Sequence, residues 1–298
     1  MSSGEITGII EKGVGGIYQV NISPEVLECK PRGSLRKDRI TPLPGDRVRV
    51  TKAEQGLSVI EEVLPRKNSL YRPAAANIDA LLIVMASTQP EPDMYLLDKL
   101  LVLAEIKGIR PIICINKTDL DGGEHLERVK ACYEKIGYSV VGISATGDPE
   151  RSRQELNQVL TDCGTTVLTG QSGVGKSTVV NLILGQEHML RGTLSAKIQK
   201  GKNTTRHAEL VMTPGGHYIV DTPGFTNFVN EGVFRYELKN YYPEFVECGD
   251  QCRFSDCRHE AEPDCAVKAR VHAGEIDSSR YQRYLELTRS LKTSKWSE

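Results

Sequence analysis

The chain has 298 residues, enough for two domains or three small ones at the usual domain size. Hydrophobic residues make up 39% and charged residues 26%, an ordinary globular balance that argues against intrinsic disorder. The longest apolar run, residues 80–86, is far shorter than the ~18 residues that span a bilayer, and no basic and apolar leader opens the chain. The composition therefore argues against membrane and secreted classes and predicts a cytoplasmic protein without a membrane partner.

The first 70 residues alternate short β-like runs with turn signals, at residues 16–20, 26–29, 46–50 and 59–63. This spacing predicts a small β-barrel. An oligonucleotide-binding barrel (OB-fold) fits the pattern, although any five-stranded barrel would show it. Arg47 and Arg49 alternate with valines, so both guanidinium groups should lie on one outer face.

Basic residues are concentrated in this first segment. Residues 1–72 hold 12 Lys and Arg against 9 Asp and Glu, while the net charge of the whole chain is −1. Such a cluster can bind phosphate groups, or it can be a solvated loop with no partner, and composition favours neither interpretation. The cluster consists of Lys30, Arg32, Arg36, Lys37, Arg39, Arg47, Arg49 and Lys52.

From residue 78 to about residue 228, fully apolar runs alternate with helical patterns. Apolar runs without polar alternation are typical of parallel strands that are buried on both faces. The segment therefore predicts a mostly parallel α/β sheet with helices on both faces. The expected strands are residues 80–85, 111–115, 139–143, 167–169 and 218–220, and the expected helices are residues 93–106, 124–136 and 154–160.

Residues 170–177 match the P-loop pattern at every fixed position. They follow an apolar run and precede a helical run, residues 178–184, which is the context that the motif requires. Glycines there let backbone N–H groups converge on phosphate oxygens. Lys176 can reach the β- and γ-phosphates, and the Ser177 hydroxyl can bind Mg²⁺. The predicted phosphate-binding residues are Gly170, Gln171, Ser172, Gly173, Val174, Gly175, Lys176, Ser177 and Thr178.

A second motif, Asn116-Lys117-Thr118-Asp119, follows the apolar run 111–115. The Asp119 carboxylate can accept hydrogen bonds from N1–H and the exocyclic amine of guanine, a donor pair that adenine does not present. Ser144-Ala145, after the run 139–143, can add a backbone N–H to the base. Together with the P-loop, these residues predict GTP and GDP as ligands and disfavour a P-loop ATPase or small-molecule kinase.

Residues 221–224, Asp-Thr-Pro-Gly, end another apolar run. Asp221 would hold Mg²⁺ through a water molecule, and the Gly224 N–H would sense the γ-phosphate. Thr204 and Thr205 lie in a polar segment that suits a switch loop, and either hydroxyl could complete the magnesium shell. With Lys176, these residues are the predicted catalytic groups.

The order of the motifs is unusual. In a Ras-like GTPase the P-loop comes first, whereas here the motifs at 116–119 and 144–145 precede it, and residues 221–224 come last. This order predicts a circular permutation, which can build the same site because chain termini often lie close together.

The C-terminal region holds a candidate metal centre. Cys252, Cys257, His259 and Cys265 provide three thiolates and one imidazole, the closed ligand set of a structural zinc site. Cys248 is a fifth candidate that spacing alone does not exclude. After this cluster, residues 279–291 predict an amphipathic helix docked on its own domain, with Arg280 and Arg283 among the charged residues beside its apolar face.

With these motifs in hand, the whole chain resembles the bacterial small-ribosomal-subunit-dependent GTPase A family. The resemblance rests on the permuted motif order, on GQSGVGKST at 170–178, DTPGF at 221–225 and CRFSDCRHEAEPDCAV at 252–267. It implies an OB-fold RNA-binding domain (1–70), a circularly permuted P-loop GTPase domain (71–230) and an α-helical zinc-binding domain (231–298). It also implies zinc ligands at Cys252, Cys257, His259 and Cys265, which leaves Cys248 out.

The resemblance also implies an activity. The chain is expected to hydrolyse GTP with Mg²⁺, slowly alone and faster on the 30S subunit, and to assist late 30S maturation. Expected partners are the 30S subunit and its 16S rRNA, with other assembly factors possible and the protein itself a monomer.

Two positions bear on the mechanism. Phe225 stands where Ras-like proteins place a water-orienting Gln, and Asn203 stands where family members often carry a His proposed as catalytic. Asn203 and His207 are candidates for the unknown general base, although Asn cannot act as a base near neutral pH. The alternative function is a GTP-gated RNA-binding switch in which hydrolysis is incidental.

Overall fold

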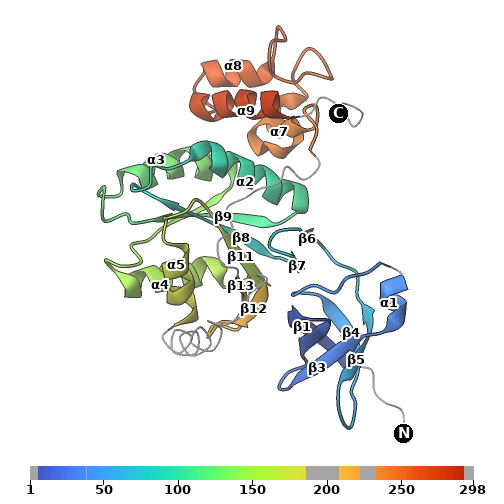
Figure 1. The fold of residues 1–298 in the computed structure, drawn as a ribbon. Helices are drawn as coiled ribbons and strands as arrows, with labels where there is room; N and C mark the ends of the chain where they lie inside the picture. Colours follow the sequence, from blue (N-terminus) through green and yellow to red (C-terminus); the bar gives the residue numbers. More distant parts are fainter. Residues whose placement is uncertain (1–5, 38, 186–207, 222–232, 292–298) are drawn as a thin grey trace.

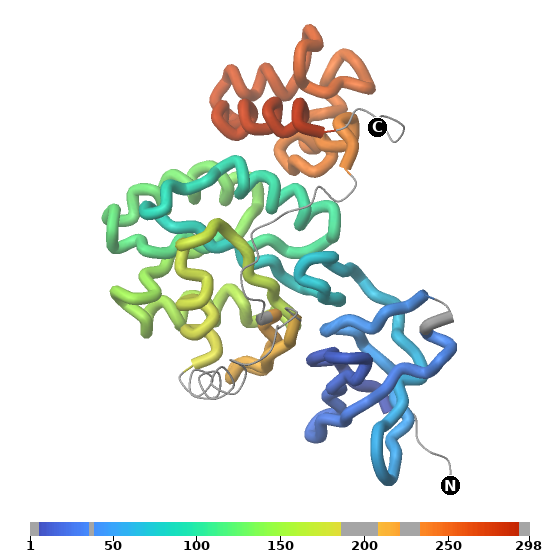
Figure 2. The backbone as a smooth tube through the Cα atoms, viewed as in Figure 1, coloured from blue at the N-terminus to red at the C-terminus, as the bar shows by residue number. Residues whose placement is uncertain are grey.

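A computed structural model describes residues 6–37, 39–185, 208–221 and 233–291 of the chain (Figure 1). A β-barrel, an α/β body and a small helical unit follow one another along the sequence. Figure 2 shows the barrel and the helical unit at opposite ends of the α/β body. Among the residues so described, no helix is both long and apolar enough to cross a membrane.

Five strands close the barrel. Their order is β1-β2-β3-β5-β4, and β4 pairs back with β1, while β3 and β5 run parallel. Val48 and Val50 are buried inside it, whereas Arg47 and Arg49 face outward as the alternation predicts. The barrel elements are β1 (Ile6–Val14), β2 (Ile17–Asn21), β3 (Val26–Pro31), α1 (Gly33–Lys37), β4 (Arg47–Thr51) and β5 (Ser58–Val63).

The α/β body is built on strands in the order β10-β9-β8-β11-β13-β12, parallel except for β12. Helices α2 and α3 cover one face of the sheet, and α4 and α5 cover the other (Figure 1). Its elements are β6 (Ser69–Leu70), β7 (Ala75–Ala76), β8 (Ala80–Ala86), α2 (Met94–Lys107), β9 (Arg110–Asn116), α3 (Glu124–Tyr133), η1 (Glu134–Ile136), β10 (Ser139–Gly142), α4 (Pro149–Leu160), β11 (Thr165–Thr169), α5 (Lys176–Leu184), β12 (Glu209–Met212) and β13 (Tyr218–Asp221).

The central strands explain the uninterrupted apolar runs. All seven residues of β8 are buried, because the strand has helices on both faces and strands on both sides. A parallel strand in that position has no solvent-facing side that would favour a polar residue. The predicted α/β class is therefore confirmed. Helix α4 begins earlier than expected, where Asp148 accepts a hydrogen bond from the N–H of Arg151 and Pro149 follows as the first helical residue.

In the described part of the chain, the barrel contacts β12, β13 and β7 of the α/β body. Strand β1 pairs with β12 at Lys12 and Glu209, so the two sheets are continuous. A barrel turn also packs on β7: Gly45 has a φ of +89°, and a Cβ there would lie 2.1 Å from the carbonyl oxygen of Ala76. Only glycine allows this approach.

The C-terminal unit, residues 233–291, packs against α2. Its core contains the aromatic residues Tyr242, Phe245 and Tyr284 together with Val102 of α2. Arg280, expected beside the apolar face of the last helix, is instead 1% exposed, because it pairs with buried carboxylates. The elements of this unit are η2 (Leu238–Tyr241), α7 (Pro243–Gly249), α8 (Ala266–His272) and α9 (Ser278–Ser290). The predicted domain limits at 70 and 230 stay a prediction.

Candidate active site

The P-loop connects β11 to α5, and two of its glycines are required by their surroundings. Gly170 has a φ of +136°, and a Cβ there would lie 1.9 Å from the carbonyl oxygen of Val84. At Gly175, with a φ of +95°, a Cβ would lie 2.5 Å from the Nδ2 atom of Asn116. The loop is thus pressed against β8 and against the second motif, and any side chain would push them apart.

Lys176 opens α5 and turns back over the loop. Its ammonium donates hydrogen bonds to the carbonyl oxygens of Gly170 at 2.8 Å and Gln171 at 2.6 Å. Partial burial lowers the pKa of Lys176 from its ordinary value. A cation beside a helix N-terminus, where backbone N–H groups point outward, is a suitable receptor for a phosphate chain.

Asn116 brings the three separate motifs together. Its side chain is buried at the end of β9, where Nδ2 donates to the carbonyl oxygen of Val174 at 2.9 Å. Its Oδ1 accepts from the N–H of Ala145 at 3.1 Å. One amide therefore joins the P-loop, the loop after β9 and the loop after β10, all at the carboxyl edge of the parallel sheet, where α/β proteins bind ligands.

The next two residues fix the same loop. The Lys117 ammonium donates to the carbonyl oxygen of Gly173 at 3.0 Å and to that of Gln89. Thr118 donates from both N–H and Oγ1 to the carbonyl oxygen of Ile143, each at 3.2 Å. We call residues 116–123 the base loop.

Asp119 is oriented by a neighbouring hydroxyl. Ser144 Oγ donates to its carboxylate, and the N–H of Gly147 donates to Ser144 Oγ at 3.1 Å. A carboxylate held in this way keeps acceptor positions free for a pair of donors, which is the arrangement that guanine requires.

Sequence reasoning missed the loop at residues 87–93, which follows β8. The N–H of Ser87 donates to the carbonyl oxygen of Asn116 at 2.9 Å, and Ser87 Oγ donates to that of Lys117 at 2.6 Å. Gln89 accepts from Lys117, as described above. The available signal was positional: a polar stretch directly after a buried parallel strand lies at the ligand-binding edge of the sheet.

Several predicted site residues fall outside the described part of the chain. Asp221 ends β13, where its backbone pairs with Glu209. The predictions that lie outside the described residues concern Asn203, Thr204, Thr205, His207, Gly224 and Phe225.

The C-terminal cluster has the geometry of a zinc site. Four donor atoms, from Cys252, Cys257, His259 and Cys265, lie within 4.8 Å of one another. Cys252 Sγ is 3.9 Å from Cys265 Sγ, and His259 Nδ1 is 3.4 Å from Cys265 Sγ. Tetrahedral zinc with sulfur ligands at about 2.3 Å separates two sulfurs by about 3.8 Å, so the donor set fits.

Burial changes the pKa values of two residues in the cluster. Burial raises the pKa of the Cys257 thiol to about 12, and burial lowers the pKa of His259 to about 4, assisted by the charge of Lys239. The imidazole is therefore neutral, as a metal ligand must be, and a metal ion would offset the cost of a buried thiolate. Cys248 Sγ points instead to the carbonyl oxygen of Glu244, at 3.5 Å, within its own helix.

Comparison with known proteins identifies the family of the chain. The sequence profile of the RsgA GTPase family matches residues 63–230, and that of the RsgA N-terminal domain matches residues 7–60. A relative from Ruminiclostridium cellulolyticum, named small ribosomal subunit biogenesis GTPase RsgA, is 45% identical, with 96% of this chain and 93% of the relative covered. A protein of the same name from Caldanaerobacter subterraneus subsp. tengcongensis is 44% identical, with 96% of each chain covered.

Solved structures show the same architecture. YjeQ from Thermotoga maritima superimposes with a TM-score of 0.82 at 36% identity, covering 96% of this chain and 98% of that one. YloQ, described as a circularly permuted GTPase, gives a TM-score of 0.79 at 33% identity, with 96% and 95% covered. The predicted permutation and barrel are thus confirmed, and the Cys₃His cluster fits the expected structural zinc. The chain belongs to the RsgA family of circularly permuted GTPases, enzymes that hydrolyse GTP with Mg²⁺.

Proposed function

We propose that this GTPase binds the small ribosomal subunit and assists its late maturation in the cytoplasm, hydrolysing GTP to GDP and phosphate to time its release. One observation carries the proposal: relatives named for small-subunit biogenesis match 96% of the chain at 45% and 44% identity. A match of that length includes the barrel and the metal centre as well as the GTPase.

In this proposal the base loop selects guanine and the P-loop holds the phosphates. Asp119 reads the base, Ser144 and Ala145 support it, and Lys176 neutralises the β- and γ-phosphates. Ser177, Asp221 through a water molecule, and Thr204 or Thr205 would hold Mg²⁺, which supplies further charge neutralisation when bound. The Gly224 N–H would contact the γ-phosphate.

The barrel is proposed to bind 16S rRNA within the subunit, together with the zinc-binding region. Arg47 and Arg49 lie on its outer face, although Arg49 also contacts Glu62 at 3.2 Å. Cations on a barrel face suit a phosphate backbone. We propose that the protein acts as a monomer with boundaries near residues 70 and 230, and that other assembly factors assist.

A slow intrinsic rate is part of the proposal. Phe225 follows Gly224 at the position where a Gln would orient the attacking water, and a phenyl ring cannot do so. Asn203 and His207 remain the candidates for positioning that water. Groups supplied by a partner raise GTPase rates by about 10³–10⁵ in other systems. We therefore expect the subunit to raise the hydrolysis rate substantially.

The test is the GTPase rate with and without purified 30S subunits. We expect 30S subunits to raise kcat by at least about tenfold, a threshold below the ~10³–10⁵ that partner-supplied groups give in other GTPases. Purified 50S subunits serve as the matched control and should leave the rate unchanged. An equal rate with and without 30S subunits would overturn the ribosomal part of the proposal.

Phe225 and Asn203 also favour a second candidate, a GTP-gated RNA-binding switch with incidental hydrolysis. The two functions differ in what releases the protein from RNA. If hydrolysis times release, a non-hydrolysable GTP analogue should trap the protein on the subunit, and GTP should not. If nucleotide exchange alone gates binding, substitution of Lys176 or Ser177 should impair release no more than that analogue does.

A further inference from the structure

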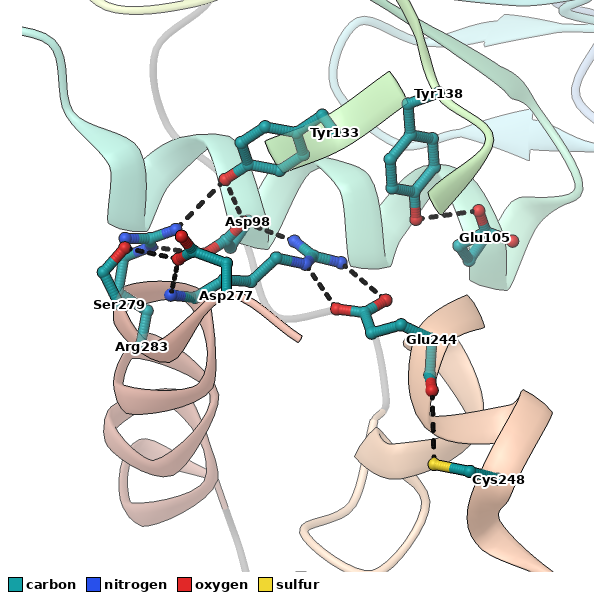
Figure 3. Close-up of polar contacts among 10 residues, drawn as sticks. Asp98, Glu105, Tyr133, Tyr138, Glu244, Cys248, Asp277, Ser279 and Arg283 are labelled. Atoms are coloured by element: carbon teal, nitrogen blue, oxygen red, sulfur yellow. Dashed lines mark hydrogen bonds and ion pairs between the residues drawn. The ribbon is translucent and has the colours of Figure 1, made fainter. Parts of the chain in front are cut away.

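A buried ionic network joins the C-terminal unit to the GTPase helices (Figure 3). Asp98 of α2 accepts hydrogen bonds from Arg280 and Arg283, each at 2.5 Å, and from the hydroxyl of Tyr133 at 2.7 Å. Glu244 of α7 accepts from Arg280 Nε at 2.6 Å. We call these five residues the Asp98 network. Two carboxylates balance two guanidinium groups, so the network is electrically neutral.

Arg280 is the centre of this network. Its guanidinium lies over the rings of Tyr242 at 4.6 Å, Tyr133 at 5.2 Å and Tyr138 at 5.9 Å. Burial alone would lower its pKa, but Asp98 and Glu244 raise the pKa well above its usual value, so the group stays charged. Removal of one member of such a buried set leaves an uncompensated charge, which is strongly destabilising.

The network contacts α2 near the N-terminal end of this helix. Helix α2 in turn follows a loop of the nucleotide site. Asp98 lies in the second turn of α2, and this helix directly follows the loop at residues 87–93. In that loop, Gln89 accepts a hydrogen bond from the Lys117 ammonium, and Ser87 Oγ donates to the carbonyl oxygen of Lys117 at 2.6 Å. A displacement of α2 would therefore move two contacts of Lys117.

The network also holds α3, which follows the base loop itself. Tyr133 lies on α3, and its hydroxyl both donates to Asp98 and accepts from Arg283 at 3.2 Å. At the other end of α3, the Asp121 carboxylate accepts from the N–H groups of Gly123 and His125, each at 3.0 Å. The two helices that begin at the nucleotide loops are thus tied to one another and to α9.

Apolar contacts of α2 with the C-terminal core accompany the network, through Val102, Tyr95 and Ile106. A cavity of about 780 Å³ lies between α3 and the turn before α9. Ser87 and Asp121 line it from the GTPase, and Asp277 and Arg280 line it from the C-terminal unit. Within the described residues, the Asp98 network therefore borders this cavity and links α3 to α9 beside it.

We propose that Arg280 is a positioning residue for guanine nucleotide binding, which sets the spacing of α2 and α3 and thereby the position of Lys117. The inference rests on the proposed nucleotide site. Arg280 acts through Asp98 and Tyr133 and makes no contact with the nucleotide. Coupling of this kind is reciprocal, so bound nucleotide must also stabilise α9.

The experiment compares Arg280→Met with wild type as full-length, zinc-loaded protein. We expect dissociation of a fluorescent GDP analogue to become about tenfold faster, and KM for GTP to rise with it, while kcat at saturating GTP changes less than twofold. Arg270→Met is the matched control, because the ion pairs of Arg270 with Glu247 and Glu275 stay within the C-terminal unit. A folded Arg280→Met that releases GDP at the wild-type rate overturns the proposal.

Two further measurements test the proposed role of Arg280 if Arg280→Met does not fold. Tyr133→Phe keeps the ring under Arg280 and removes only the hydroxyl contacts, and we expect GDP release to be two- to threefold faster. In wild type, GDP should slow amide hydrogen exchange across residues 278–290, and unchanged exchange there contradicts the proposal. Failure of wild type to bind GDP would instead refute the nucleotide site, which separates the two outcomes.

Discussion

At the scale of single residues, the site is built by side chains that hold other side chains in place. Asp119 is oriented by Ser144, and Asn116 joins the P-loop to Ala145 through both ends of its amide. A carboxylate that rotated freely in water would lose conformational entropy when it adopted the same orientation. Pre-orientation of this kind supports the proposed role of Asp119 in reading a donor pair.

Asp119→Asn should change the base preference of the site from guanine to xanthine. The amide loses the charge-assisted hydrogen bonds to guanine, each worth about 1.5–3 kcal/mol, so GDP affinity should fall by about 100-fold or more. Xanthosine diphosphate, which carries an oxygen in place of the exocyclic amine, should bind better than to wild type. Isothermal titration with both nucleotides measures the exchange.

Asp121→Asn is the control for this substitution. The Asp121 carboxylate lies in the same loop but accepts backbone hydrogen bonds at the start of α3, so its loss should not alter base preference. Unchanged selectivity in Asp119→Asn would return the P-loop ATPase to consideration.

Sequence reasoning recognises motifs whose pattern is local and misses contacts that depend on distant partners. The P-loop glycines and the base-loop motif are recognisable because their chemistry is fixed by adjacent positions. Arg280 looked like a surface residue because Asp98 lies 182 positions away. The periodicity of α9 carries no information about the buried carboxylate on α2 that pairs with Arg280.

At the scale of elements, the same distinction holds. The apolar runs of β8 and β9 were recognised as buried strands. Strand β1 (Ile6–Val14) and strand β12 (Glu209–Met212), which pairs with it, were not expected. Gly8 and Gly13 dilute the strand signal of β1, yet a Cβ at Gly8 would lie 2.6 Å from Val20. Strand β12 has only four residues, too few for its alternation to show.

The Cys₃His cluster fits a structural zinc that would stabilise the C-terminal unit, so we expect removal of zinc to unfold this unit. Cys257, Cys265 and His259 are buried in the core of the unit, where loss of the metal leaves polar groups without their charge partner. Structural zinc contributes on the order of 10 kcal/mol to folding of small domains. We expect Cys257→Ser to lose bound zinc and the near-ultraviolet circular dichroism signal of the packed tyrosines.

Cys248→Ala tests the assignment in the same helical core. Its sulfur points to a backbone carbonyl, so this variant should keep one zinc per chain by elemental analysis. Loss of zinc from Cys248→Ala, or its retention by Cys257→Ser, would show that the ligand set is wrong.

At the scale of the molecule, the permuted order changes how the parts are connected. Strand β13 ends at Asp221, and the described chain resumes at residue 233 in the C-terminal unit. The chain therefore runs from the Asp-Thr-Pro-Gly motif to the zinc-binding unit within about a dozen residues, while the Asp98 network joins the same unit to α2. The barrel is attached elsewhere, at β12 and at the turn before β4.

That turn contains the most buried charge of the barrel junction. The Asp46 side chain is fully buried and accepts from Arg66 Nε at 2.7 Å and from the N–H of Leu43 at 2.7 Å. Arg66 also donates to the carbonyl oxygen of Thr41. Beside it, Asn77 donates to the carbonyl oxygen of Gly45, where the chain enters β8. Asp46 thus fixes the turn on which the barrel meets the α/β body.

Arg66→Met should destabilise the whole junction, because Asp46 would keep its buried charge without a cation. Breaking a buried pair costs about 3–5 kcal/mol, whereas an exposed pair is worth about 0–1 kcal/mol. Arg32→Met is the matched control, since Arg32 pairs with Glu61 at 2.6 Å but its side chain is 65% exposed. Urea unfolding should show a large loss for the first variant and little for the second, and hydrogen exchange should localise the loss to residues 43–50. If Arg66→Met lost as little free energy of unfolding as Arg32→Met, Asp46 would be stabilised by the turn itself. Packing at Gly45 and Ala76, rather than charge, would then hold the barrel in place.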